Sequence, residues 1–252
     1  MKALRPLLLL GALLLPAAAW SGTVACGAPE EMLEASDPLP ATARAIASGS
    51  LRIVVAGSAS VLGPGTSSPD APWPARLKAM LQARHPGLKV DMVVHGARGL
   101  TAADTAALIT GEAARAPTQL ALWQAGTVEA VRSLDVDDMV AALNAGLERL
   151  QATRTDAVLI DLQFSRFLRA NANVEPYREA LRLVAAAHDV PLVRRYELMQ
   201  FWAETERVDL ERAPRNAKVA TADRLNDCLA QAVLAVLEEG VAQARAQPAP
   251  KP

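Results

Sequence analysis

Short apolar segments alternate with amphipathic segments along most of this chain, and this alternation constrains the fold more than any other sequence feature. The apolar segments are bounded by turn-forming or polar residues, and several are rich in Val and Ile, as expected for buried strands. They are Leu51–Ala56, Val90–Val94, Gln119–Trp123, Ala157–Leu162 and Val190–Val193. Apolar residues recur at helical spacing in Trp73–Arg84, Met139–Leu150, Tyr177–Ala187 and Asp223–Glu239. Strands that alternate with helices pair in parallel, so the pattern predicts an α/β fold with a doubly wound sheet.

The N-terminus has the features of an export signal. Lys2 and Arg5 precede an apolar run from Leu7 to Leu15, and the alanines that follow offer a small-residue cleavage site. The run is too short for a transmembrane helix, and no other segment stays apolar long enough to span a bilayer. We therefore predict a secreted or periplasmic protein without a transmembrane segment in its mature chain.

The rest of the chain is long enough for one domain with a sizeable core. We expect a signal peptide at 1–25, a single domain at 26–245 and a disordered tail, rich in Pro and Ala, at 246–252. The formal net charge is −1, which gives no reason to expect nucleic acid as a partner.

The two cysteines, Cys26 and Cys228, allow two interpretations. Export places them where disulfides persist, and their wide separation without a nearby His excludes a local metal knuckle. However, the segment from Thr23 to Cys26 also resembles a lipoprotein processing site, although Thr23 stands where Leu is usual. A lipid anchor on Cys26 is therefore the alternative to a disulfide.

The carboxyl ends of the predicted strands are where a doubly wound sheet binds its ligands. The segment Ala56–Gly65 follows the first strand and contains three glycines and two serines. It lacks the Lys of a phosphate-binding loop, and Ser68 stands where a dinucleotide fingerprint needs a third Gly. We therefore expect no cofactor and interpret the segment as the turn of a serine hydrolase.

Four blocks in the correct order resemble the secreted SGNH (GDSL-type) hydrolases, across about Cys26 to Val236. They are LRIVVAGSASVLGPGTSSPDAPWPARLKAML, VDMVVHGARGLTAAD, LALWQAGTVEAV and TADRLNDCLAQAV. The resemblance implies a flavodoxin-like three-layer α/β/α sandwich with a five-stranded parallel sheet. Secreted members carry one Cys at the mature N-terminus and one in the last block, so the resemblance also implies a disulfide between Cys26 and Cys228.

The resemblance also implies that most of the catalytic groups are missing. In the family, a Ser attacks an ester, an Asp-oriented His takes the proton, and backbone N–H groups and an Asn side chain hold the oxyanion. The retained positions are Gly96, an oxyanion donor, and Asp223, the orienting acid. The nucleophile and oxyanion Asn positions fall on Ala59 and Val128. The base falls on Asn226 or is deleted, because the loop before Cys228 is shorter than in the family. We therefore expect a degenerate protein that binds an acylated or carbohydrate ligand, or a partner protein.

A shifted register gives the alternative, an active esterase. Ser58 or Ser60 would then be the nucleophile, with His95 as its base, because His95 directly precedes Gly96 in the second block. His95 could instead be an ordinary polar residue at the end of a strand, because a triad requires position as well as presence.

Several charged residues have both a structural and a functional interpretation. Asp135, Asp137 and Asp138 could bind a metal, but without a His partner we expect them to cap a helix and predict no metal site. His85 and His188 resemble residues at helix ends.

The residues at the remaining strand ends also leave alternatives open. Arg194 and Arg195 follow the fifth strand, where Arg can bind a carboxylate or phosphate or form a structural salt bridge. Trp123, Gln124 and Gln163 could line a pocket, although core packing is the expectation for Trp123. Gly57 and Gly96 are expected to be required by the backbone, with positive φ as the reason.

Overall fold

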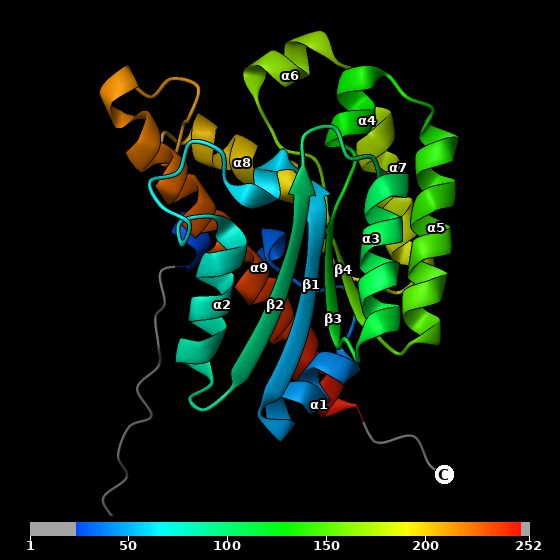
Figure 1. Ribbon diagram of the computed structural model, residues 1–252. Helices are drawn as coiled ribbons and strands as arrows, with labels where there is room; N and C mark the ends of the chain where they lie inside the picture. The colour runs from blue at the N-terminus through cyan, green and yellow to red at the C-terminus, as the bar shows by residue number, and fades with distance from the viewer. Residues whose placement is uncertain (1–23, 248–252) are drawn as a thin grey trace, which may run out of the picture.

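Five strands form one parallel sheet in the order β2-β1-β3-β4-β5 in the computed structural model, which describes residues 24–247 (Figure 1). The strands are β1 (Ser50–Ser58), β2 (Lys89–Ala97), β3 (Leu120–Gln124), β4 (Asp156–Ile160) and β5 (Leu192–Val193). All four pairings are parallel. The predicted fold class and the five predicted strands are therefore confirmed.

The fifth strand is much shorter than the others because of a proline. Pro191 has no backbone N–H to donate to β4, although its carbonyl accepts from Leu159 N at 2.9 Å. The paired residues of β5 are therefore Leu192 and Val193 alone. The chain then turns directly into a helix, so charged residues follow the strand at the carboxyl edge.

Helices cover both faces of the sheet and complete the three layers (Figure 1). One face is covered by α1 (Pro40–Ser48), α2 (Trp73–Arg84) and α9 (Lys218–Ala246), and the other by α3 (Ala102–Arg115), α5 (Val136–Ala152) and α7 (Glu175–Ala187). The short helices α4 (Thr127–Arg132), α6 (Arg166–Asn171) and α8 (Arg195–Glu204) lie near the carboxyl edge. Alternate residues of β1 point into the two apolar cores, Ile53 and Val55 into one and Val54 and Ala56 into the other.

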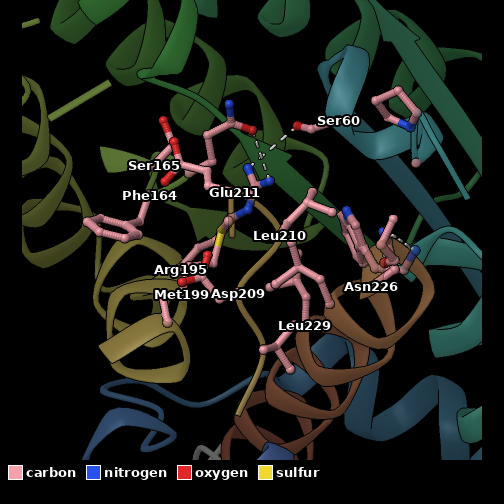
Figure 2. A pocket seen from close by; sticks show the side chains of 18 residues that line it. Ser60, Phe164, Ser165, Arg195, Met199, Asp209, Leu210, Glu211, Asn226 and Leu229 are labelled. Carbon is pink, nitrogen blue, oxygen red and sulfur yellow. Dashed lines mark hydrogen bonds between the residues drawn. The ribbon is translucent and has the colours of Figure 1, made fainter. Parts of the chain in front are cut away.

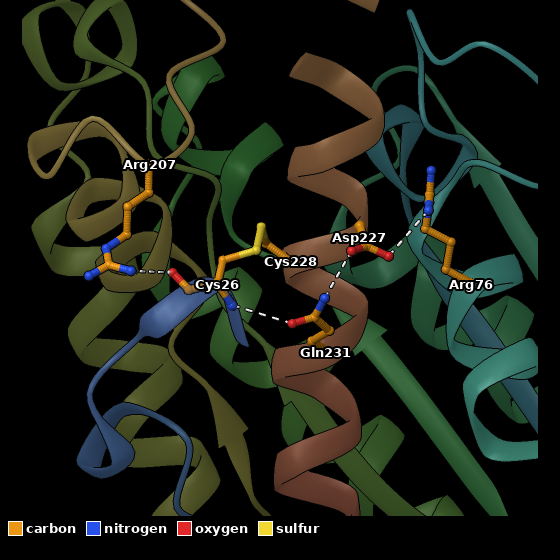
Figure 3. The surroundings of a disulfide bond; sticks show 6 residues. All are labelled: Cys26, Arg76, Arg207, Asp227, Cys228 and Gln231. Carbon is orange, nitrogen blue, oxygen red and sulfur yellow. Dashed lines mark hydrogen bonds and ion pairs between the residues drawn. A yellow bond between two sulfur atoms is a disulfide. The ribbon is translucent and has the colours of Figure 1, made fainter. Parts of the chain in front are cut away.

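The last helix ties the N-terminal arm to the domain through a disulfide (Figure 3). Cys26 and Cys228 are bonded, with 5.4 Å between their Cα atoms. Cys26 N also donates to the side-chain oxygen of Gln231, one turn along α9, at 3.3 Å. A thiol in a disulfide cannot carry a lipid, so this arrangement favours the disulfide over the lipoprotein interpretation.

Gly57 and Gly96 are required by the fold, but not for the reason expected. Neither has positive φ. A Cβ on Gly57 would lie 2.8 Å from a methyl of Val61, and one on Gly96 would lie 2.8 Å from Leu62 Cγ, both far too close for carbon atoms. The predicted φ is therefore wrong, and the close approach of the turn after β1 is the physical reason.

The predicted segments at the two ends of the chain can be compared with the structure only in part. Positions 1–23 of the expected signal peptide and 248–252 of the expected tail lie outside the described residues. Helix α9 continues to Ala246, one residue beyond the expected domain boundary. No helix within 24–247 is long and apolar enough to cross a membrane.

Candidate functional site

The turn after β1 places Ser60 at the carboxyl edge of the sheet. Strand β1 ends at Ser58, and a 3-10 helix, η3, runs from Ala59 to Leu62. Ser60 Oγ lies 2.6 Å from Gln124 Nε2, 3.5 Å from Arg195 Nη1 and 3.4 Å from Ser58 Oγ. The structure thus brings together the two serines with residues that end β3 and begin α8.

Ser60 lies on the wall of a pocket of about 170 Å³. Figure 2 shows that its walls come from the β1 turn, the segment after β4, helix α8, the loop that follows it and helix α9. Most of the lining side chains are apolar: Trp73, Phe164, Met199, Ala203, Val208, Leu210, Ala222, Leu225 and Leu229. The polar lining consists of Ser60, Gln163, Ser165, Arg195, Asp209, Glu211 and Asn226.

Two polar residues of the last block, Asp223 and Asn226, hold the loop in front of α2. Asp223 Oδ1 accepts from Ser67 N at 2.9 Å, and Asn226 Oδ1 accepts from Trp73 N at 3.0 Å. The two hydrogen bonds from Ser67 lower the pKa of the Asp223 carboxyl. Asn226 Nδ2 donates to Ala222 O within its own helix, so both ends of the amide are occupied.

The other matched positions lie outside the pocket lining. Ala59 begins η3, Gly96 packs beneath that turn, and Val128 is half-buried in the first turn of α4. Valine has no hydrogen-bond donor for an oxyanion. Of the positions carried over from the family, only Asn226 reaches the pocket.

His95 faces the opposite side of the sheet from the serine turn. It precedes Gly96 on β2, and adjacent strand residues point to opposite faces. Gly96 faces η3, so His95 faces α3, where its Nε2 lies 3.4 Å from the Glu112 carboxylate. Within the described part of the chain, no hydrogen bond joins His95 to Ser58 or Ser60.

Two buried ionisable groups lie at the carboxyl ends of β4 and β5. Asp161 directly follows β4 and accepts from Tyr196 N at 2.8 Å, and burial raises the pKa of its carboxyl to about 7. Arg195 is 5% exposed, and burial lowers the pKa of its guanidinium to about 10. In both cases desolvation outweighs the nearby opposite charges.

Three structural interpretations made from the sequence are confirmed. Asp135 caps α5 by accepting from Asp137 N at 2.7 Å. His85 and His188 each follow the last residue of a helix. Trp123 is fully buried in the core and donates from Nε1 to Thr105 Oγ1 at 2.8 Å.

The two adjacent arginines that follow β5 differ in their partners. Arg194 forms the salt bridge that was one of its two interpretations, 3.3 Å from Glu197, whereas Arg195 forms none among the described residues. No group of three or more His, Cys, Asp or Glu side chains in 24–247 could hold a metal ion.

Asp161 and the loop with Asp209 and Glu211 were not identified from the sequence. Asp161 lies inside the apolar segment Ala157–Leu162, where a buried carboxylate at a strand end is itself a signal of a site. Asp209 and Glu211 lie in a segment without apolar periodicity, so nothing in the sequence placed them near Ser60.

Comparisons with known proteins agree with this fold. Residues 25–243 match the family described as Non-GDSL lipase-like. The fold is similar to that of LAE5, an alpha/beta hydrolase enzyme from the metagenome of Lake Arreo, with 19% identity, TM-score 0.59 and coverage of 75% of this chain and 95% of the other. Axe2, an acetylxylan esterase from Geobacillus stearothermophilus, gives 15% identity, TM-score 0.57 and coverage of 74% and 94%.

A third structure, TesA, gives 17% identity, TM-score 0.55 and coverage of 71% of this chain and 95% of its own. At such identities these likenesses establish the fold alone. No curated protein sequence matches this chain. The expected SGNH-type fold is thereby confirmed.

Proposed function

The chain belongs to the Non-GDSL lipase-like family, and from this premise we propose that it is an SGNH hydrolase-like protein of the cell envelope that has lost catalysis and acts by binding. Its ligand is an acylated or carbohydrate molecule or a partner protein, and the pocket beside Ser60 is the binding site. The disulfide between Cys26 and Cys228 supports an envelope location, because such bonds persist outside the cytosol.

The observation that carries this proposal is the role of Asp223 and Asn226. In a catalytic SGNH site the matching acid and His form the pair that removes a proton from the nucleophile. Here both side chains accept hydrogen bonds from the backbone of the loop before α2. An amide such as that of Asn226 cannot take a proton at neutral pH, so these positions serve the fold.

Ser60 also lacks the neighbour that a nucleophile needs. Gln124 Nε2 and Arg195 Nη1 are donors, and the third group near Ser60 Oγ is the hydroxyl of Ser58. None of these groups acts as a general base, which normally contributes about 10²–10⁴ to the rate. The contact of His95 with Glu112, on the other face of the sheet, leaves it unavailable to either serine.

The proposal is tested with purified exported protein, short-chain nitrophenyl esters and a serine-directed fluorophosphonate. We expect hydrolysis at the background rate and no labelling. Ala59→Ser is expected to remain inactive, because Asn226 cannot act as its base. Hydrolysis or labelling that disappears in Ser58→Ala, Ser60→Ala or His95→Ala would overturn the proposal and establish the esterase that uses Ser58 or Ser60.

A further inference from the structure

Arg195 is a buried cation without a carboxylate partner. Its side chain lines the pocket and is 5% exposed, yet no Asp or Glu oxygen of the described residues lies within 4.0 Å of its guanidinium. By contrast, the similarly buried Arg178 has carboxylate oxygens of Glu175 and Glu197 at 2.8 Å. Because an unpaired buried charge is costly, Arg195 is a candidate for a binding group.

The hydrogen bonds of Arg195 also leave most of its donors unused. Nη1 lies 3.5 Å from Ser60 Oγ and Nη2 lies 3.5 Å from Gln163 Oε1, both at the outer limit for hydrogen bonds. Nε is buried without a hydrogen-bond partner. Figure 2 shows the guanidinium on the pocket wall, near Ser60. A guanidinium has five N–H donors, and this one therefore retains capacity for an acceptor inside the pocket.

The acids around the pocket are already bound to other groups. Asp209 lies 2.9 Å from Arg166 Nη1, and Glu211 accepts from the backbone N–H groups of Arg166 and Phe167 at 2.6 and 3.2 Å. Asp161, which directly follows β4, accepts from Tyr196 N and lies 4.0 Å from Arg178. Asp161 is near enough to interact with the charge of Arg195, but none of these acids lies within 4.0 Å of the guanidinium. Its N–H donors therefore remain available to a ligand.

The remaining walls restrict the size and polarity of that ligand. A volume of about 170 Å³ is close to that of engineered protein cavities of about 150 Å³ that bind benzene. The side chains of Trp73, Phe164, Met199 and Leu229 supply an apolar surface around it. A ligand that satisfies both features has an anionic group at one end and an apolar body of roughly one aromatic ring.

We propose that the pocket binds a small organic carboxylate, with its carboxylate on the guanidinium of Arg195 and its apolar body against Trp73, Phe164 and Leu229. The planar guanidinium matches a carboxylate with two parallel hydrogen bonds. Ser60 and Gln163 orient the guanidinium from either side. This inference rests on the binding role in the proposed function, because the pocket must retain such a ligand and not produce it by hydrolysis, and it assigns a free acid to the pocket in place of an acylated or carbohydrate molecule.

The test compares two pairs of probes on the unaltered protein by calorimetric titration: benzoate with benzamide, and hexanoate with hexanamide. Each pair differs in charge and hardly at all in shape. We expect each acid to bind at least about ten-fold more tightly than its amide, as a charge-assisted bidentate contact predicts. Equal binding of acid and amide, or no binding of any probe, would overturn the carboxylate assignment.

Variants then locate the contact. Arg195→Gln is expected to weaken benzoate binding at least about ten-fold and to bring it level with benzamide. Arg194→Gln is the matched control, because the guanidinium of Arg194 pairs with Glu197 outside the pocket. This variant is expected to bind benzoate as the unaltered protein does. Equal loss in both variants contradicts the assignment. If Arg195→Gln does not fold, the comparison of acid with amide decides.

Two further measurements distinguish failure of the carboxylate assignment from failure of the proposed function. Inorganic phosphate is expected to compete poorly with benzoate, since it has no apolar body, and competition as strong as that of hexanoate would contradict the organic part of the assignment. Ester hydrolysis or fluorophosphonate labelling would overturn the proposed function itself, whether or not benzoate binds. Absence of both activity and benzoate binding would leave the proposed function standing and remove only this inference.

Discussion

The side-chain oxygen of Asn226 accepts a hydrogen bond from the backbone N–H of Trp73 at 3.0 Å. Trp73 is the first residue of α2, and the residue before it, Pro72, has no side chain that could cap the helix. One of the N–H groups that every helix leaves unsatisfied at its start is therefore satisfied from α9. The residue that the family resemblance aligns with the catalytic His therefore joins two helices here.

We predict that Asn226→Ala destabilises the protein by about 1–3 kcal/mol, because the buried N–H of Trp73 then has no partner. Asn226→Asp keeps an acceptor and is expected to lose much less. Urea denaturation of the three proteins gives both values. An Ala variant as stable as the unaltered protein would mean that this hydrogen bond does not contribute to stability.

We predict that Gly57→Ala and Gly96→Ala each destabilise the protein by about 1–3 kcal/mol, the usual effect of inserting a methyl into a packed space. In each case the new Cβ would lie 2.8 Å from a side chain of the turn that carries Ser60. Gly111→Ala is the matched control. Gly111 has open space around it in α3, and Ala is expected to stabilise that helix by up to about 1 kcal/mol.

Thermal or urea unfolding of the three glycine variants tests this explanation. If Gly57→Ala and Gly96→Ala behave like Gly111→Ala, the turn after β1 does not approach β1 and β2 as closely as the structure has it.

The fold could be predicted from the sequence because its signals are local. Each strand is an apolar segment of a few residues, and the alternation with amphipathic segments dictates parallel pairing. The site was harder, because its contacts join residues distant in the sequence. The absence of a His at position 226 could be read from the sequence, but the hydrogen bond that Asn226 accepts from Trp73 N spans 153 positions. Likewise, Arg194 and Arg195 are adjacent and chemically identical, and only packing determines which one pairs with Glu197.

We predict that reducing the disulfide lowers the stability by up to about 5 kcal/mol, the chain-entropy value for a loop of this length. The bond joins residues that are 202 positions apart and anchors the N-terminal arm against α9. Unfolding with and without a reductant gives the difference, and Cys26→Ala should match the reduced protein. Mass spectrometry of the non-reduced protein is the direct check. Two free thiols, or a lipid on Cys26, contradict the prediction.

We predict that Asp161→Asn makes the protein more stable than the parent, and increasingly so as the pH rises. Burial raises the pKa of the Asp161 carboxyl to about 7 in the folded protein, against about 3.9 in an unfolded chain. Between these values the folded state holds the proton that the unfolded state has released, so stability falls as the pH rises and then levels off above 7. Asn stays neutral and can still accept from Tyr196 N.

The size of this effect follows from the pH interval. Each pH unit between the two pKa values costs about 1.4 kcal/mol, so the advantage of Asp161→Asn should grow by about 2–3 kcal/mol between pH 5 and pH 8. Urea denaturation of both proteins at these two pH values measures it, and the pH 5 comparison serves as the internal control for any loss of packing. An advantage that stays constant, or shrinks toward pH 8, would mean that Arg178 and Arg195 outweigh desolvation and keep Asp161 ionised.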